Sequence, residues 1–194
     1  NCVVRDNLAG NAGGVYCGAS SATFTNCTLS GNVADNYGGG LVCDGYSAAT
    51  FKNCVISGNM ADRNGGGLFC YYASPTFTNC TMSGNEAGSL GGGGVICDYS
   101  SPAFRSIIIA FSIGSGIWFR GSTNCTMEYC DISGNSGANI QFRDNDPSQG
   151  PACIGQLVTA NENGDSCDVY FNIFLDPLFA DTAADDFHLT DFSP

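Results

Sequence analysis

Apolar and polar positions alternate in short runs over much of the chain. Residues 23–25, 27–29 and 41–43 each place apolar side chains on one face and mostly polar side chains on the other, as half-buried β-strands require. Asn and Gly, which tolerate a positive φ, separate the runs. Glycine is too frequent for pairs of helices, because it destabilises a helix interior by roughly 1 kcal/mol relative to alanine. The pattern predicts an all-β fold with three short strands in each repeat.

The pattern repeats about every 26 residues, a length typical of stacked solenoids. Each copy begins with an Asn-Cys pair and ends with a glycine run followed by an apolar-x-Cys strand. Nothing between the strands signals a chain reversal, so we expect successive copies to pair in parallel about 4.8 Å apart. The sequence therefore predicts a single-stranded parallel β-helix of about six coils.

Equivalent positions in such a stack form columns. One predicted inward column contains Phe24, Phe51, Phe77 and Phe104. A column of asparagines contains Asn7, Asn32, Asn59, Asn85 and Asn135. We expect the asparagines to form a ladder at a corner, where their carboxamides satisfy turn backbone groups. The periodicity stops near residue 145, so we expect coils over 1–145, with a last coil, loops and a C-terminal cap over 146–194.

Two features of the repeat resemble a known family. Leu/Ile/Met-Ser-Gly-Asn steps occur at 29–32, 56–59, 82–85 and 132–135, and Gly-Gly-x-apolar steps occur at 39–42, 66–69 and 93–96. Together they resemble the repeat pair of polymorphic outer-membrane proteins and related bacterial right-handed β-helix proteins. The tail at 176–179 and 186–189 is similar to the closing segment of secreted β-helix repeat proteins. The resemblance implies right-handed coils and an extracellular or cell-surface location. It does not select a function, because the group includes adhesins, surface fibres and polysaccharide-degrading enzymes.

Charge and chain ends narrow the possible partners. The net charge of -12, with only six basic residues, argues against nucleic acid and anionic membrane surfaces. No apolar run approaches the roughly 20 residues that span a bilayer, so we expect no membrane insertion. The chain opens inside a repeat and without Met, which suggests an excised piece of a longer protein. We therefore expect the first coil to stack on an upstream domain or on another copy of the chain.

The twelve cysteines fall mostly in two columns. The first column contains Cys2, Cys27, Cys54 and Cys80, and the second contains Cys17, Cys43, Cys70 and Cys97. The following coil has Ile107 and Phe119 at these two positions, so both columns lose cysteine in the same coil. Joint loss favours disulfides within coils, with the pairs Cys2–Cys17, Cys27–Cys43, Cys54–Cys70 and Cys80–Cys97. Four further cysteines could tie the tail to the last coil in any of three pairings, namely Cys125, Cys130, Cys153 and Cys167. The alternative is that the thiols are reduced and pack as small hydrophobes. A metal site is not favoured, because there is no Cys-x-x-Cys pair and only one histidine.

An outward column is the strongest candidate for a binding or interface surface. Alternation places on the outside Tyr16, Val42, Phe69, Ile96 and Trp118. Beside them we expect a row of Asp44, Tyr71, Asp98 and Arg120, and then Tyr46, Tyr72 and Tyr99. Aromatic rings next to carboxylates suit either sugar recognition or a protein interface. The alternative is that a loop or the C-terminal tail covers this face.

Catalytic candidates are weaker. Asp35 and Asp62 occupy equivalent positions, about 5 Å apart in a stack, and paired carboxylates near that separation serve retaining glycoside hydrolases. The favoured interpretation is that both are ordinary solvated residues of an Asn/Gly-rich turn, since the following coil has Gly88 there. A polysaccharide lyase would use clustered basic residues with calcium, but the basic residues here are scattered. The main prediction is a non-catalytic, structural or adhesive surface protein that self-associates and needs no cofactor. The alternative is a carbohydrate-binding or polysaccharide-degrading protein, for which calcium would be a possible cofactor.

Overall fold

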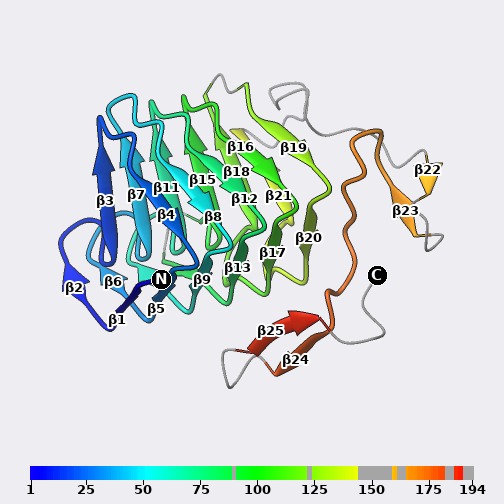
Figure 1. The fold of residues 1–194 in the computed structure, drawn as a ribbon, viewed down its shortest axis with the longest axis horizontal. Coiled ribbons are helices and arrows are strands. Elements are labelled where there is room, and N and C mark those ends of the chain that lie inside the picture. The colour runs from blue at the N-terminus through cyan, green and yellow to red at the C-terminus, as the bar shows by residue number, and fades with distance from the viewer. Residues whose placement is uncertain (89–90, 122–123, 144–158, 161–164, 182–185, 190–194) are drawn as a thin grey trace.

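The computed structural model describes residues 1–88, 91–121, 124–143, 159–160, 165–181 and 186–189. The chain winds about five times into a parallel β-solenoid whose strands stack in four sheets, A to D (Figure 1). The predicted fold class is therefore confirmed. Within the described part of the chain, no helix is long and apolar enough to cross a membrane.

Each sheet takes one strand from successive coils. Sheet A contains β1 (Val3–Arg5), β5 (Thr28–Ser30), β9 (Val55–Ser57), β13 (Thr81–Ser83), β17 (Ile108–Ala110) and β20 (Asp131–Ser133). Sheet B contains β2 (Leu8–Ala9), β6 (Val33–Ala34), β10 (Met60–Ala61) and β14 (Glu86–Ala87). Sheet C contains β3 (Val15–Gly18), β7 (Leu41–Asp44), β11 (Leu68–Tyr71), β15 (Val95–Asp98), β18 (Ile117–Arg120) and β21 (Ile140–Phe142). Sheet D contains β4 (Thr23–Thr25), β8 (Thr50–Lys52), β12 (Thr76–Thr78), β16 (Ala103–Arg105) and β19 (Thr126–Glu128).

Two antiparallel pairs follow the coils, β22 (Thr159–Ala160) with β23 (Ser166–Cys167) and β24 (Phe179–Asp181) with β25 (Asp186–Leu189). The coils differ from the predicted plan in one respect, since the early coils have a fourth strand in sheet B. This two-residue strand is too short to show as an alternating run. It forms because a left-handed residue such as Gly31 (φ 61°) turns the chain after sheet A, and after Asn32 the residues Val33 and Ala34 pair with the neighbouring coil.

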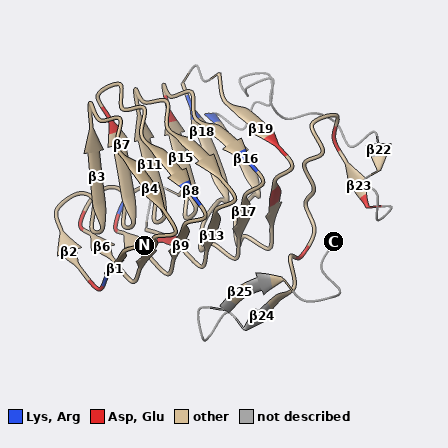
Figure 2. Cartoon of the chain, viewed as in Figure 1, with Lys and Arg blue, Asp and Glu red and all other residues tan. Residues whose placement is uncertain are grey.

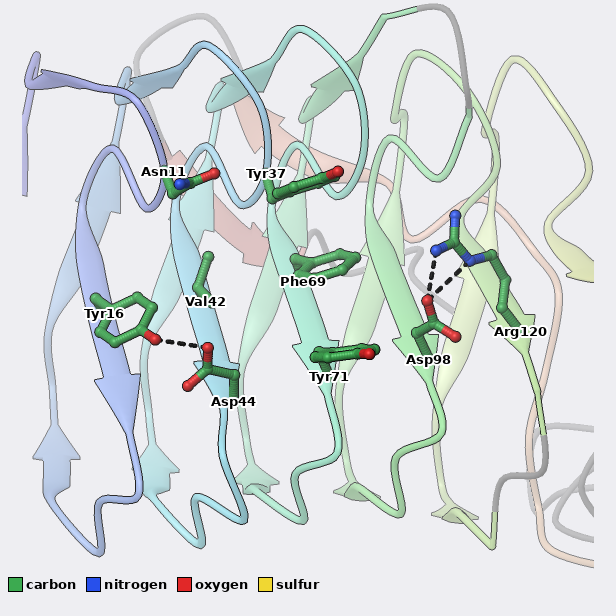
Figure 3. Close-up of a pocket in the computed structure, with 9 residues that line it drawn as sticks. All are labelled: Asn11, Tyr16, Tyr37, Val42, Asp44, Phe69, Tyr71, Asp98 and Arg120. Atoms are coloured by element: carbon green, nitrogen blue, oxygen red, sulfur yellow. Dashed lines mark hydrogen bonds and ion pairs between the residues drawn. The ribbon is translucent and has the colours of Figure 1, made fainter.

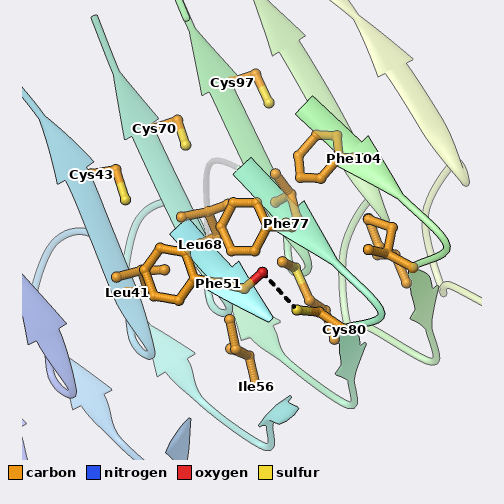
Figure 4. Close-up of a cluster of buried hydrophobic side chains, with 14 of the residues drawn as sticks. Leu41, Cys43, Phe51, Ile56, Leu68, Cys70, Phe77, Cys80, Cys97 and Phe104 are labelled. Atoms are coloured by element: carbon orange, nitrogen blue, oxygen red, sulfur yellow. Dashed lines mark hydrogen bonds between the residues drawn. The ribbon is translucent and has the colours of Figure 1, made fainter. Parts of the chain in front are cut away.

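The predicted phenylalanine column is confirmed. Phe24, Phe51, Phe77 and Phe104 are direct partners on neighbouring strands of sheet D. Their ring centroids are 4.8, 4.8 and 5.5 Å apart, which is the spacing of the strands themselves. Figure 4 shows the labelled rings of the last three in a row between sheets C and D. Because each ring packs on the next, the core is continuous along the axis.

The predicted asparagine ladder is also confirmed. The Nδ2 group of Asn32 donates to Oδ1 of Asn59, and Nδ2 of Asn59 donates to Oδ1 of Asn85, both at 3.0 Å. Asn59 Nδ2 also donates to the Leu29 carbonyl at 2.9 Å, and Asn59 Oδ1 accepts the backbone N–H of Asn32. These three carboxamides are fully buried. The ladder thus satisfies backbone groups at the corner between sheets A and B, where the strand pairing is interrupted.

The predicted disulfides within coils are wrong, because all eight of these cysteines are free thiols. Cys43, Cys70 and Cys97 lie in a row on sheet C, whereas Cys80 lies apart from them beyond the Phe77 ring (Figure 4). Opposite sheets are about 10 Å apart, which exceeds the roughly 7 Å between Cα atoms that a disulfide allows.

Some of these thiols donate hydrogen bonds to backbone carbonyls, and burial raises the pKa of others. The Sγ atoms of Cys54 and Cys80 donate to the carbonyls of Phe24 and Phe51, at 3.7 and 3.6 Å. Burial raises the pKa of the Cys97 thiol, so this group is protonated at neutral pH. Of the remaining four cysteines, Cys130 and Cys167 are free thiols, which excludes the predicted pairings that use them. Cys125 is disulfide-bonded, and Cys153 lies outside the described residues.

A C-terminal segment covers the edge of sheet A at its last strand, β20 (Figure 1). The Ile173 N–H donates to the Cys130 carbonyl at 2.8 Å, and the Ile132 N–H donates to the Ile173 carbonyl. The Asn172 side chain accepts from the Cys130 N–H and donates to the Met127 carbonyl. The buried Asp168 carboxylate accepts the N–H of Asn172. These bonds pair backbone groups that would otherwise form an open strand edge.

The first prediction concerns the asparagine ladder. We expect Asn59→Ala to lower the free energy of unfolding by about 2–4 kcal/mol, because it leaves several buried backbone and carboxamide groups without partners. The matched control is Asn53→Gly, which removes an exposed asparagine pair, Asn53 with Asn26, and keeps the left-handed backbone. We expect the control to cost less than about 1 kcal/mol in urea unfolding. Equal losses for the two variants would contradict a special role for the buried ladder.

The second prediction concerns pH. Burial raises the pKa of Asp131 to about 7 from an ordinary 3.8, with the Asp176 carboxylate acting in the same direction. Between these two values the folded protein holds a proton that the unfolded chain releases, so stability falls as pH rises through this range. We expect the melting temperature to drop by several degrees between pH 5 and pH 8, and Asp131→Asn to reduce that drop. Asn can still accept the Leu175 N–H, as the carboxyl does. An unchanged pH profile in the variant would refute the assignment.

Candidate functional site

A hollow of about 480 Å³ lies on the outer face of sheet C (Figure 3). It is lined by Asn11, Tyr16, Tyr37, Val42, Asp44, Phe69, Tyr71, Asp98 and Arg120. The in-register pairing of strands β3 to β18 places one or two of these residues on each strand. Six of the predicted binding residues therefore meet in one place.

The apolar outer column of sheet C, of which Val42 and Phe69 line the hollow, is covered. Val42, Phe69 and Ile96 retain only 4, 8 and 0 % of their exposure, so the prediction of an open apolar column was wrong for these three. The turns before the sheet C strands fold back over them. A Cβ atom on Gly38 would lie 2.3 Å from Val42 Cγ2, and one on Gly92 would lie 2.3 Å from Ile96 Cγ1. Both glycines have a positive φ, at 64° and 69°. The turns therefore cover these residues, as in the alternative prediction that a loop covers this face.

A second small core results from this cover. Val42, Phe69 and Ile96 pack with Ala12, Tyr37 and Trp118 on the outer face of sheet C. Trp118, one of the predicted binding residues, is half-buried, and its Nε1 atom is buried without a hydrogen-bond partner in the described residues. Neither Trp118 nor Ile96 is among the residues that line the hollow. Their side chains contribute to packing beneath and beside it.

One wall presents an open aromatic ring beside a carboxylate. Tyr16 is 58 % exposed, and Figure 3 shows its ring turned face-on to the viewer of this surface. Its hydroxyl donates to Asp44 Oδ2 at 2.5 Å. This bond raises the pKa of Tyr16, with smaller effects of burial and of the Asp44 charge. The phenol therefore stays protonated at neutral pH and holds Asp44 in place.

The middle of the hollow is a short stack of rings. Tyr37 lies 4.9 Å from Phe69, and Phe69 lies 6.3 Å from Tyr71, measured between ring centroids. Tyr71 remains 42 % exposed. Ring stacks of this kind are rigid, so they hold their shape without a ligand. The stack divides the hollow into a side with Tyr16 and Asp44 and a side with Asp98 and Arg120 (Figure 3).

An ion pair forms the far side. The Arg120 guanidinium donates to Asp98 Oδ2 through Nε at 3.2 Å and also through Nη2. Asp98 is buried, and the guanidinium carbon lies 5.2 Å from the centroid of the Trp118 ring. Two carboxylates and one guanidinium thus border the hollow, and the only one of the three that is free of an ion pair is Asp44. The hollow offers hydrogen-bond acceptors between aromatic surfaces and no unpaired cation.

Comparison with known proteins agrees with the architecture. The family model described as the right handed beta helix region matches residues 13–170, which is most of the chain. The chain belongs to the right-handed β-helix family. No curated protein and no solved structure matches it.

The weak catalytic candidates of this β-helix lie elsewhere. Asp35 and Asp62 follow β6 and β10 in equivalent, exposed positions, and neither lines the hollow. Their N–H groups donate to the carbonyls of Ala9 and Ala34, one coil earlier. The next coil has Gly88, where a Cβ would lie 2.1 Å from the Asp62 carbonyl oxygen. The described residues of the β-helix hold no cluster of three or more His, Cys, Asp or Glu suited to a metal ion.

Sequence reasoning missed Asn11 and Tyr37, which both line the hollow. Both lie in the turns before sheet C rather than in a strand, so alternation does not place them. The glycine run that follows Tyr37 is the sequence signal that could have located this turn over the strands. A left-handed residue at Gly38 folds this turn of the β-helix back onto the strands and brings Tyr37 over Phe69.

Proposed function

We propose that this β-helix is a non-catalytic carbohydrate-binding protein whose site is the hollow on sheet C. The observation that carries the proposal is the exposed Tyr16 ring, held by Asp44 at the mouth of the hollow. A sugar ring has apolar C–H faces, which pack on aromatic rings, and hydroxyl groups, which donate to carboxylates. Ligand sites of this kind combine apolar surface with a few fixed polar groups.

The charges favour a neutral carbohydrate. Asp44 and Asp98 border the hollow, and Arg120, the one basic residue that lines it, is already paired with Asp98. Charged residues on the coils are scattered, without a basic face (Figure 2). The chain as a whole carries a net charge of -12. An acidic polysaccharide would meet repulsion from both sources and would find no free cation to bind.

Binding is better supported than cleavage. A general acid must carry a proton to its leaving group. Asp98 accepts two hydrogen bonds from a guanidinium, which is the arrangement of an ionised carboxylate. Asp44 lies two strands away, on β7, and accepts the Tyr16 hydroxyl. Each carboxylate is therefore held as an acceptor, which suits recognition of sugar hydroxyls.

The repeat sequence supports a location outside the cell. The Ser-Gly-Asn and Gly-Gly-x-apolar steps resemble those of polymorphic outer-membrane proteins and of secreted β-helix proteins. A rigid solenoid with a carbohydrate site on one flank would serve as an adhesive surface module. Self-association through the first coil stays a prediction. Strands β1 to β4 end the four sheets on that side, and their outer edges have no strand partner within the described residues.

The third prediction tests this site. We expect Tyr16→Ala to weaken binding of a soluble neutral glycan roughly tenfold, because it removes the open ring and frees Asp44. Asp44→Asn should weaken binding several-fold, because a neutral amide is a poorer acceptor than a carboxylate. The control is Tyr129→Ala, which removes an exposed tyrosine outside the hollow. Affinity would be measured by calorimetry against glucan, mannan, xylan and acidic polygalacturonate.

Two results would count against the proposal. One is the absence of binding to every neutral glycan, and the other is equal binding by the wild type and Tyr16→Ala. Release of new reducing ends during the titration would instead establish the hydrolytic alternative. Tighter binding of polygalacturonate than of neutral glycans would overturn the assignment of ligand charge.

A further inference from the structure

The corners of the solenoid contain columns of residues with left-handed backbone. At the corner between sheets D and A the column contains Asn26, Asn53 and Asn79, each with φ of 52°. At the corner between sheets A and B it contains Gly31, Gly58 and Gly84. Gly and Asn are the residues that adopt this conformation at little cost. At these positions the two corners follow ordinary backbone preferences, whereas later coils place Ser106 and Tyr129 at the first corner and Phe111 at the second.

The corner between sheets C and D departs from this rule. Tyr46, Tyr72 and Tyr99 have φ of 66°, 47° and 47°. A bulky residue with positive φ is uncommon, and such strain concentrates at functional sites. The three residues are 85, 42 and 44 % exposed, so burial of their side chains does not offset the strain. We name these three residues the tyrosine ridge.

Two other aromatic residues at left-handed corners contact a ring of the C-terminal segment. Phe111 (φ 56°) lies 6.1 Å from the Phe179 ring, and Tyr129 (φ 55°) stacks on Phe171 at 5.3 Å. In the tyrosine ridge, Tyr72 and Tyr99 stack on each other at 5.2 Å, and no ring contact to Tyr46 occurs in the described structure. The ridge hydroxyls make no hydrogen bond to any described residue. Within the described residues, no ring of the C-terminal segment packs on the ridge.

The ridge is continuous with the hollow. Tyr71 lines the hollow at the end of β11, and its ring meets the Tyr72 ring edge-on at 4.6 Å. Tyr99 directly follows Asp98, which also lines the hollow. A ligand that leaves the hollow past Tyr71 therefore passes onto exposed tyrosines. Phenol rings provide apolar faces with a hydroxyl at the tip, which matches a neutral polyhydroxylated chain and not a charged one.

We propose that the tyrosine ridge is a second subsite that binds the continuation of a neutral polysaccharide held in the hollow. This inference rests on the proposed function, since the hollow anchors the chain. It makes the ligand an extended polymer rather than a single terminal sugar. A disaccharide would occupy the hollow alone, and a hexasaccharide would reach the ridge. The strained backbone is retained because it presents the rings outward at the corner.

The fourth prediction is the test of this subsite. Tyr46→Asn and Tyr72→Asn keep a residue that tolerates the left-handed backbone. We expect each to weaken hexasaccharide binding roughly three- to tenfold and to leave disaccharide binding unchanged. The probes are a disaccharide and a hexasaccharide of whichever neutral glycan the wild type binds. We also expect Tyr46→Asn to raise the melting temperature by about 2–4 °C, because it relieves strain without removing a ring contact.

The matched control is Asn53→Tyr, which places a tyrosine at the corresponding left-handed position of another corner. We expect it to lower the melting temperature and to leave both affinities unchanged. Loss of hexasaccharide binding in the ridge variants, with Tyr16→Ala losing both ligands, supports the subsite. Unchanged hexasaccharide binding in the ridge variants, while Tyr16→Ala still loses binding, overturns the subsite and leaves the hollow intact. A fall in melting temperature for Tyr46→Asn would show that the tyrosine is structural and would also overturn it.

Discussion

The parallel hydrogen bonding of each coil to the next, residue over residue, is the constraint on which the whole molecule depends. It places chemically equivalent side chains about 4.8 Å apart, so a column of one residue type becomes a stack or a ladder. A shift of one residue within a strand would exchange its inward and outward faces. Coil lengths nevertheless differ, since Leu68 pairs with Val95, 27 residues on, and Val95 pairs with Ile117, 22 residues on. The extra residue of the second coil is absorbed at a corner, at Gly45 and Tyr46, and sheet C stays in register.

The corners accommodate the differences in coil length, so the strands between them stay regular and in register. Left-handed residues turn the chain sharply, and the asparagine ladder supplies bonds to the backbone groups that the turn leaves unpaired. The buried thiols of Cys54 and Cys80 act similarly at the corner between sheets D and A, where their Sγ atoms donate to carbonyls of the preceding coil. The strands therefore maintain the register between coils, and the corners turn the chain and satisfy the unpaired backbone groups. Strand positions that point outward are consequently free to carry function.

Period-two alternation and the repeat length were enough to predict the phenylalanine column and the asparagine ladder, because both follow from register alone. They were not enough to predict what covers Val42, Phe69 and Ile96. That cover depends on the path of a turn, which a positive φ at Gly38 determines and alternation does not encode. The joint loss of cysteines at Ile107 and Phe119 also has a simpler cause than disulfides. Both replacements are buried hydrophobic residues that fill the core with larger side chains.

The sequence indicated where the site lies but not which side chains would interact there. The outer column of sheet C explains this difference. Its last strand position is Gly18, Asp44, Tyr71, Asp98 and Arg120 in successive coils. These residues share no chemical property, yet their inward neighbours remain Cys or Phe and the strand pairing is unbroken. The backbone bonds and the core determine the fold, so they impose no pattern on this position. A site built from one outward residue per coil can therefore change its ligand without changing the solenoid. Only the folded structure shows that Asp44 contacts Tyr16 and that Asp98 contacts Arg120.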